Sequence, residues 1–318
     1  MSERPTLRQL EYLVTLADTL HFGDAAARCH VSQPALSAQV RALERTLGVD
    51  LVERTTRRVL LTPVGRDVAA RARDVLRAVD DLGAAAAAAR GPLVGPLRLG
   101  VIPTIAPYVL PDVLPTVRAA YPGLELQLRE DFTDRLVDEL VAGRLDLLLL
   151  ALPVDVPGVD TMALVDEPFL VVAPTGDALS ALDQVRPDQV DRHDLLLLQE
   201  GHCLRDQALA LCERRPPSRA RDIVDGTSLT TLVQMVANGL GVTLLPATAV
   251  PLEVHRCDEV TVRSFAPPAP GRTLGLAWRR SSGRARDFET LGGLLREQLD
   301  ALVRHDVAPV RHDVVPDT

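Results

Sequence analysis

The stretch GHCLRDQALALC, residues 201–212, holds two of the four cysteines of the chain, Cys203 and Cys212, with His202 directly before the first. Helical spacing of apolar residues resumes at Leu204, so we expect Cys203 at or just before the N-terminus of a helix. A thiolate there gains from the helix dipole and from free N–H groups, which predicts a pKa below the ordinary cysteine value. A thiolate of this kind reacts with oxidants to give a sulfenic acid, which a second thiol can convert to a disulfide.

The spacing of the two cysteines prevents direct pairing in an intact helix. Nine residues of helix span about 13.5 Å and leave the two side chains on opposite sides, whereas a disulfide requires Cα atoms within about 7 Å. Disulfide formation would therefore require the segment to unwind, as a conformational switch does. The alternative is that Cys212 is an ordinary core residue and Cys203 an incidental neighbour. The segment alone leaves both interpretations open.

The composition limits the class of protein around this pair. A chain of 318 residues with 47% hydrophobic and 25% charged residues is typical of a globular protein with two or three domains. No signal peptide is apparent, and the most apolar run, residues 145–154, is too short to cross a bilayer, so we expect a cytoplasmic protein without a membrane partner. In the cytosol four cysteines do not predict a structural disulfide framework. We expect Cys29 to be a core residue and Cys257 to be an exposed thiol.

No spacing of cysteines and histidines predicts a zinc site, and no glycine-rich loop predicts a dinucleotide, so we expect no metal ion and no cofactor. The charge is unevenly distributed: the net charge is −8, yet residues 1–66 carry nine arginines against seven acidic residues, a local balance of +2. This asymmetry permits DNA binding by a small N-terminal domain attached to an acidic remainder.

The first ninety residues have the pattern of a winged helix-turn-helix. Apolar spacing predicts helices over about 6–18 and around 25–27, followed by a helix that Ser32 caps and that ends at Gly48. The last of these would enter the DNA major groove, and the stretch LVERTTRRVLLT at 51–62 predicts a β-hairpin wing with arginines for phosphates. A helical bundle with an arginine-rich loop is the alternative. The candidate DNA-binding residues are Ser32, Gln33, Pro34, Ser37, Arg41, Arg54 and Arg57.

A long helix follows from Thr62 and carries an apolar stripe. A lone helix must bury such a stripe, and pairing with a second copy of the chain would do so. A dimer would also present two recognition helices to a pseudo-palindromic site. The alanine run at 84–89 could equally be a plain helical linker. The stripe consists of Val64, Val68, Val75, Val79 and Leu82.

Strands and helices alternate from residue 92 onward. The stretch LRLGVI predicts a strand, Thr104 a cap, residues 107–120 a helix and LELQLRE the next strand. A helix at 134–143 and the apolar strand LDLLLLAL continue the alternation, and PFLVVAP begins a second run of the same kind. Continuous apolar strands between helices predict a parallel sheet that is covered on both faces. A helix at 285–303 would return to the first part of the sheet.

The stretch LRQLEYLVTLADTLHFGDAAARCHVSQPALSAQVRALERTLGVDLVERTTRRVLLTPVG resembles the N-terminal domain of the LysR-type transcriptional regulators, with the SQPALS turn into the recognition helix and the LT..G exit from the wing. The layout of the remainder resembles the effector domain of that family. The resemblance implies an N-terminal winged helix-turn-helix with a long linker helix, followed by a C-terminal α/β bilobed, periplasmic-binding-protein-like regulatory domain. The implied divisions are 1–62 for DNA binding, 63–91 for the linker and dimerisation helix, 92–167 with 272–302 for regulatory lobe I, 168–271 for regulatory lobe II with the redox segment, and 303–318 for a disordered tail.

Within that family, EGHCLRDQA…C resembles the redox segment of the peroxide-sensing branch. Other stretches of the chain, VIPTIAPYVLP, EDFTDRL, TSLTTLVQMVANGLGVTLLPA and RTLGLAW, also resemble that branch. The resemblance implies that Cys203 attacks hydrogen peroxide and that Cys212 resolves the product to a disulfide. It further implies that four side chains hold the peroxide oxygens and stabilise the charge leaving the O–O bond. These are Thr104, Thr133, His202 and Arg272.

On this resemblance we expect a regulator rather than an enzyme. Its partners would be double-stranded promoter DNA, hydrogen peroxide, further copies of itself in a dimer or tetramer, and a thiol reductant that resets it, with RNA polymerase as another candidate. The first rival is a LysR-type regulator that binds a small organic effector between the lobes and has inert cysteines. A thiol peroxidase is the second, which the DNA-binding pattern disfavours, and a periplasmic solute receptor would need a signal peptide.

Overall fold

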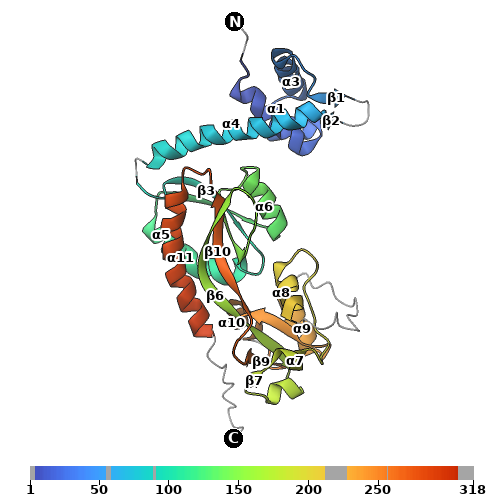
Figure 1. Cartoon of the computed structure of the whole chain (residues 1–318), viewed down its shortest axis with the longest axis vertical. Coiled ribbons are helices and arrows are strands. Elements are labelled where there is room, and N and C mark those ends of the chain that lie inside the picture. Colours follow the sequence, from blue (N-terminus) through green and yellow to red (C-terminus); the bar gives the residue numbers. More distant parts are fainter. Residues whose placement is uncertain (1–3, 55–58, 89–90, 212–227, 256, 307–318) are drawn as a thin grey trace. The chain divides into compact units, whose positions relative to one another are not determined.

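The computed structural model describes residues 4–54, 59–88, 91–211, 228–255 and 257–306. It divides the chain into two compact units, residues 1–89 and residues 90–318 (Figure 1). Each unit has a hydrophobic core of its own. No helix in the described part of the chain is long and apolar enough to cross a membrane.

The N-terminal unit is a winged helix-turn-helix whose helix ends follow local sequence signals. Thr6 and Gln9 form a capping box at the first helix. The Ser32 hydroxyl accepts the N–H of Ala35 at 3.4 Å, and Gly48 ends the same helix with a φ of 70°, so both predicted ends of the recognition helix are confirmed. The elements are α1 (Leu7–Thr19), α2 (Phe22–Arg28), α3 (Gln33–Leu47), β1 (Val52–Arg54), β2 (Val59–Leu61) and α4 (Pro63–Ala88).

Helix α4 packs on α1 along only part of its surface. Ala69 and Ala72 are buried, and Arg73 forms an ion pair of 2.6 Å with Asp18 of α1. The next part of the predicted apolar stripe stays exposed, and Leu82 has 71% of its surface accessible. The exposed members of the stripe are Val64, Val75, Val79 and Leu82.

The second unit is built on one eight-stranded sheet, in the order β4-β3-β5-β10-β6-β9-β7 with β8 also paired to β6. Strand β3 runs parallel to β4 and β5, but β10 is antiparallel to both β5 and β6. The sheet is therefore mixed and not parallel as expected, because two strands cross between the lobes in opposite directions. The strands are β3 (Gly95–Val101), β4 (Leu124–Glu130), β5 (Leu147–Leu152), β6 (Val159–Pro174), β7 (Gln184–Val185), β8 (Thr243–Pro246), β9 (Val260–Phe265) and β10 (Gly271–Arg279).

Two hydrophobic cores divide this sheet into two lobes. The first core lies under β3, β5 and the C-terminal part of β10, with α5 and α11 on one face and α6 on the other (Figure 1). The second core surrounds residues 169–173 of β6 together with β8, β9, α8 and α9. The helices are α5 (Ala106–Ala120), α6 (Thr133–Val141), α7 (Pro187–Val190), α8 (Cys203–Leu211), α9 (Leu229–Ala237), α10 (Val250–Val254) and α11 (Ala285–Asp306), with short 3-10 helices η1 (Ala178–Ala181) and η2 (Ala247–Ala249).

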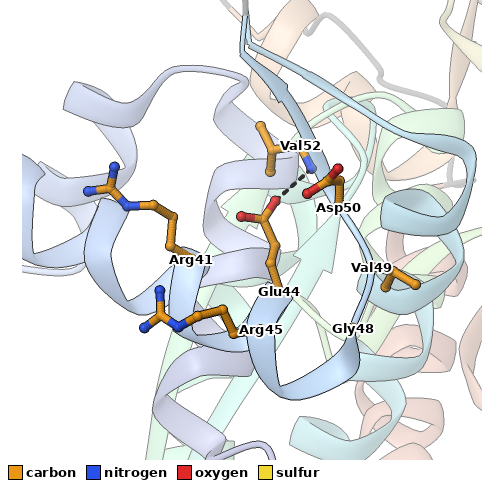
Figure 2. A pocket seen from close by; sticks show the side chains of 7 residues that line it. All are labelled: Arg41, Glu44, Arg45, Gly48, Val49, Asp50 and Val52. Atoms are coloured by element: carbon orange, nitrogen blue, oxygen red, sulfur yellow. Dashed lines mark hydrogen bonds between the residues drawn. The ribbon is translucent and has the colours of Figure 1, made fainter.

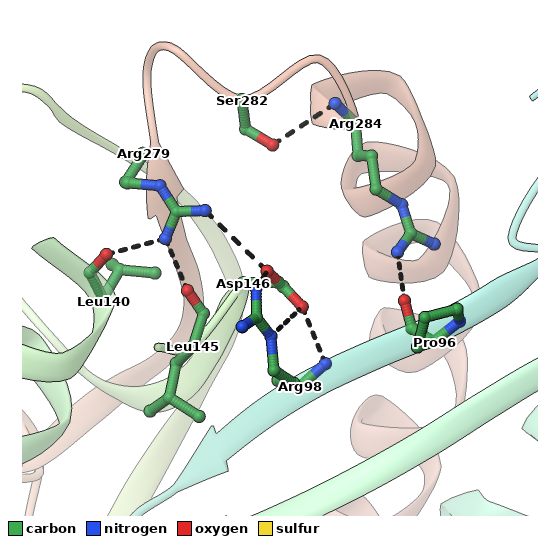
Figure 3. Close-up of polar contacts among 8 residues, drawn as sticks. All are labelled: Pro96, Arg98, Leu140, Leu145, Asp146, Arg279, Ser282 and Arg284. Carbon is green, nitrogen blue, oxygen red and sulfur yellow. Dashed lines mark hydrogen bonds and ion pairs between the residues drawn. The ribbon is translucent and has the colours of Figure 1, made fainter. Parts of the chain in front are cut away.

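Arginine side chains fasten the returning strand β10 and helix α11 to the first lobe (Figure 3). Arg98 donates to both carboxylate oxygens of Asp146, at 3.0 and 2.7 Å. Arg279 of β10 donates to the carbonyl oxygens of Leu140 and Leu145, and Arg284 donates to the carbonyl of Pro96 at 2.6 Å. The bonds from Arg279 and Arg284 give hydrogen-bond partners to backbone carbonyl groups that would otherwise be unsatisfied.

The C-terminal helix is longer than predicted. Helix α11 continues through Val303, whose side chain is buried, to Asp306. The irregular tail expected from residue 303 therefore does not include residues 303–306, because Val303 completes the apolar face of α11. Residues 307–318 lie outside the described residues.

Candidate functional site

Cys203 is the first residue of helix α8, as the sequence predicts. Gly201 precedes it with a φ of 96°, and a Cβ atom there would lie 3.4 Å from the ring of Phe132. Leu204 and Ala208 pack in the core of the second lobe, whereas Cys203 packs against the core of the first. Cys203 therefore lies where the two lobes meet, and it is a free thiol.

Arg272 lies buried beside this thiol at the beginning of β10. Its Nη1 donates to the hydroxyl of Thr104 at 2.8 Å, and its Nη2 donates to the carbonyl of the same residue at 2.9 Å. Thr104 was expected to cap a helix, but the cap position of α5 belongs to Ile105. The expectation is wrong because the Thr104 hydroxyl accepts from a residue that is distant in the sequence.

A buried carboxylate holds the other edge of Arg272. The Nε of Arg272 donates to Oε2 of Glu167 at 2.7 Å, and neither side chain is exposed to solvent. The second oxygen of Glu167 accepts the N–H of Thr248 at 2.9 Å and its hydroxyl at 2.5 Å. Thr248 in lobe II, Glu167 and Arg272 on the crossing strands, and Thr104 in lobe I therefore form one continuous hydrogen-bonded chain.

Two further predicted pocket residues carry buried polar atoms without a hydrogen-bond partner. Thr133 begins α6 and His202 precedes Cys203. The Thr133 hydroxyl and the Nε2 of His202 are inaccessible and make no well-formed hydrogen bond to any described residue. The His202 ring packs edge-on against Phe132, with 4.7 Å between the ring centroids. Unpaired buried polar atoms are costly, so the Thr133 hydroxyl and the His202 nitrogen are both free to bond with a further group.

The electrostatics of Cys203 differ from the sequence prediction. Burial raises the pKa of the Cys203 thiol, although the charge of Arg272, the Thr133 hydroxyl and the backbone of Leu204 act in the opposite direction. The expected depression of this pKa is therefore wrong for the reduced state, because the helix-terminus argument does not include desolvation. Burial also lowers the pKa of the His202 imidazole, so this ring is held in its neutral form at neutral pH.

An open cleft adjoins the other side of Arg272. It has a volume of about 580 Å³ and is lined by Glu167, Gln207 and Arg272, among other residues. Gln207 lies one helical turn after Cys203 on α8, and its Oε1 atom is also buried without a described partner. Neither Cys203 nor Thr104 lines the cleft.

Cys29 and Cys257 are not part of this arrangement. Cys212 lies outside the described residues, directly after the end of α8. Cys29 closes α2 and packs against the core of the N-terminal unit, as expected. Cys257 is buried in lobe II rather than exposed, because it follows α10 into the second core. Among the described residues no group of histidines, cysteines and acids could hold a metal ion.

Five of the seven candidate DNA-binding residues lie on helix α3 or at its N-cap. Ser32, Gln33, Pro34 and Arg41 are exposed, and Ser37 is half-buried. Figure 2 shows Arg41 and Arg45 pointing away from the wing, while Glu44 turns toward it and accepts the N–H groups of Leu51 and Val52 at 3.0 and 3.2 Å. Arg57 lies outside the described residues, as does the side chain of Arg54.

Two family models match the chain. That of the bacterial regulatory helix-turn-helix proteins of the lysR family matches residues 7–66, and that of the LysR substrate binding domain matches residues 90–300. A protein of Streptomyces viridosporus named probable hydrogen peroxide-inducible genes activator is 50% identical over 296 residues, which are 93% of this chain and 95% of that protein.

Solved structures agree with these matches. Full-length OxyR from Pseudomonas aeruginosa is 41% identical, with a TM-score of 0.76 over 92% of this chain and 95% of that one. An H2O2-bound cysteine-to-serine mutant of OxyR from Corynebacterium glutamicum is 39% identical, with a TM-score of 0.68 over 96% of both chains. The chain belongs to the LysR-type transcriptional regulators, in their OxyR branch. The predicted fold class is thereby confirmed.

For this member of the OxyR branch, the residues that sequence reasoning missed are those that support the pocket. Glu167, Thr248, Gln207 and Phe132 were not among the candidates. The only signal for Glu167 is an acid next to the apolar run PFLVVAP, within what becomes a long buried strand. Thr248 and Gln207 carry no local signal, because their roles depend on contacts across the fold.

Proposed function

We propose that this chain senses hydrogen peroxide through Cys203 and answers by changing how it binds promoter DNA. The observation that carries the proposal is the environment of Cys203: a half-buried thiol beside the Arg272 cation and the Thr133 hydroxyl, with the unpaired His202 nitrogen on the adjacent residue. An OxyR relative that has been solved in an H2O2-bound form supports peroxide as the ligand. The curated relative is named for the genes that peroxide induces.

The chemistry requires only these groups and a second thiol. The Cys203 sulfur, once deprotonated, attacks one oxygen of hydrogen peroxide; the S–O bond forms, the O–O bond breaks, and the departing hydroxide takes up the proton and leaves as water. Arg272, Thr104 and Thr133 would stabilise the charge that moves onto the leaving oxygen. The sulfur of Cys212 then attacks the sulfenic sulfur, a disulfide forms and a second water leaves. A dithiol reductant restores both thiols by exchange.

The second step requires the protein to refold locally. In this structure Cys203 is a free thiol and α8 is an intact helix from Cys203 to Leu211, and a helix of that length holds its two ends too far apart for a disulfide. Pairing would unwind α8 and withdraw Leu204 and Ala208 from the core of lobe II. Such a change in lobe II could alter how subunits pack and how pairs of α3 helices are spaced along DNA.

The test is mass spectrometry of the reduced protein after treatment with stoichiometric peroxide. We expect a Cys203–Cys212 disulfide in the wild type, and a sulfenic acid at Cys203, trapped by dimedone, in Cys212→Ser. Cys203→Ser should stay unmodified, and Cys257→Ser, a matched buried thiol, should behave as the wild type. If both thiols of the wild type stay unmodified while the protein still binds DNA, the proposal is wrong.

One observation favours a second candidate, a regulator of this family that answers to a small organic effector. The cleft beside Arg272 offers about 580 Å³ and is lined by both apolar and polar residues, which is typical of small-molecule sites. A rise in the melting temperature with a small carboxylate, together with thiols inert to peroxide, would support this candidate over the first.

A further inference from the structure

The two strands that cross between the lobes are joined by a buried ion pair. Glu167 of β6 and Arg272 of β10 stand directly opposite each other in the antiparallel ladder, with 2.7 Å between Arg272 Nε and Glu167 Oε2 and no solvent exposure of either side chain. Removing two charges from water is costly, and a well-packed apolar pair is often as stable. A purpose other than stability therefore has to be considered for this pair.

Both oxygens of the Glu167 carboxylate are used, on different sides. Oε2 accepts from Arg272, and Oε1 accepts from the backbone and the hydroxyl of Thr248. The carboxylate cannot turn without losing one of these partners. An amide in its place has only one accepting atom, so it could satisfy Arg272 or the Thr248 N–H but not both.

Arg272 is in turn fixed on two edges. Its Nε is bound to Glu167, while Nη1 and Nη2 are bound to the hydroxyl and the carbonyl of Thr104. Three of the five N–H groups of the guanidinium are thereby fixed in one plane. The charge of this group acts on the Cys203 sulfur and favours the thiolate.

We propose that Glu167 is a positioning residue for the reaction of Cys203 with peroxide: anchored by Thr248, it holds the Arg272 guanidinium toward Thr104 and so fixes the cation beside the reacting sulfur. This inference rests on the proposed function of Cys203. It assigns to Glu167 no contact with peroxide. Its effect passes entirely through Arg272.

Glu167 has two opposing effects on Cys203, and they predict opposite changes in the oxidation rate when the carboxylate is removed. By holding Arg272 in place, it keeps a cation where negative charge develops on the sulfur and on the leaving oxygen. The negative charge of Glu167 also partly cancels the positive charge of Arg272, which reduces the stabilisation of negative charge on the sulfur. If positioning dominates, loss of the carboxylate slows oxidation; if charge compensation dominates, the same loss accelerates it.

The experiment uses the full-length reduced protein and the variant Glu167→Gln, which keeps the shape and removes the second acceptor. Two quantities are measured for the Cys203 peptide by mass spectrometry: the rate constant for oxidation by hydrogen peroxide at neutral pH, and the pH at half-maximal alkylation by iodoacetamide. We expect oxidation to slow about 10- to 100-fold, as misplacement of a catalytic group does, and the alkylation midpoint to move to higher pH.

A second variant keeps the test decisive if Glu167→Gln does not fold. Thr248→Val removes the hydroxyl that anchors Glu167 but leaves the backbone N–H, so oxidation should slow in the same direction by a smaller factor. Thr243→Val is the matched control, because Thr243 is equally buried in lobe II and its hydroxyl donates to the Leu196 carbonyl at 2.9 Å, away from Arg272. This control should oxidise at the wild-type rate.

The outcomes separate this inference from the function on which it rests. A wild-type Cys203 that peroxide does not oxidise overturns the proposed function and the inference with it. A reactive wild type with an equally fast or faster Glu167→Gln overturns the inference alone. The same holds if Thr248→Val and Thr243→Val oxidise at equal rates.

Discussion

The reactivity of Cys203 is set by a balance of local effects that have opposite signs. Burial disfavours the thiolate, whereas the Arg272 charge and the Thr133 hydroxyl favour it. Thr133 is the simplest of these groups to examine, because its hydroxyl acts on the Cys203 sulfur and makes no well-formed hydrogen bond to a described residue. Its removal should therefore change the thiol without disturbing the fold.

We predict that Thr133→Val raises the pKa of Cys203, since the hydroxyl favours the thiolate and a hydrogen bond to a charged group is worth about 1.5–3 kcal/mol. The thiolate fraction below the pKa, and with it the rate of alkylation at neutral pH, should fall about tenfold. The pH dependence of alkylation, followed on the Cys203 peptide, checks this. An unchanged midpoint would show that Thr133 does not contact the sulfur.

The residue scale also marks where sequence reasoning stops. Cys203 at the start of a helix could be predicted, because the apolar spacing that begins at Leu204 is local. The sign of its pKa shift could not, because burial comes from the first-lobe core, which only the fold brings near. Thr104 was misread as a cap for the same reason: its partner, Arg272, is 168 residues away.

Three helices are linked across the lobes by one carboxylate. The hydroxyl of Tyr108 on α5 donates to Glu253 of α10 at 2.6 Å, and Thr230 of α9 donates to the same oxygen at 3.1 Å. Burial, followed by the bond to Glu253, raises the pKa of Tyr108, so this hydroxyl keeps its proton and remains a donor. Helix α9 begins at Leu229, shortly after the segment that holds Cys212. The link therefore ties that end of α9 to lobe I.

We predict that Tyr108→Phe lowers the melting temperature of the regulatory unit by about 2–4 °C, because a partly exposed hydrogen bond contributes about 1 kcal/mol. Amide hydrogen exchange at the beginning of α9 should become faster. Tyr121→Phe serves as the control, because Tyr121 follows the end of α5 and its hydroxyl makes no hydrogen bond to a described residue. Equal effects of the two variants would argue against the link.

At the level of elements the sequence was informative wherever the signal is local. Ser32, Pro34 and Gly48 determine where α3 begins and ends, and the chain obeys them. The direction of β10 could not be predicted, because an apolar strand looks the same whichever way it runs beside its neighbours. The length of β6 was missed because residues 159–167 carry mixed polar and apolar side chains, and they are paired in the first lobe only once β10 returns.

On the scale of the whole molecule, the exposed stripe of α4 is the feature that one chain leaves incomplete. Val75, Val79 and Leu82 lie on one side of the helix and remain exposed in the N-terminal unit. A second copy of the same helix is the occupant that the proposed function requires, since two recognition helices must be held together to read two half-sites.

The double substitution Val79→Asp with Leu82→Asp should therefore lower the oligomer mass measured by sedimentation by at least half. Affinity for a duplex that carries both half-sites should fall by about 100-fold or more, because the second half-site is no longer engaged at high effective concentration. Ala70→Glu, an exposed position on another side of α4, should leave both measurements unchanged. An unchanged mass in the double variant would contradict a dimer seam on α4.

The resting state of the Cys203 thiol also determines which reagents the protein does not respond to. Desolvation raises the pKa of the half-buried Cys203 thiol, so this sulfur is mostly protonated at neutral pH, and reagents that need an ionised thiol find a poor target. A small molecule could instead form hydrogen bonds with the Thr133 hydroxyl and the His202 nitrogen, which have no partner among the described residues. Under the proposed function, the low reactivity of the resting sulfur makes the response specific for peroxide and also lowers the rate of oxidation.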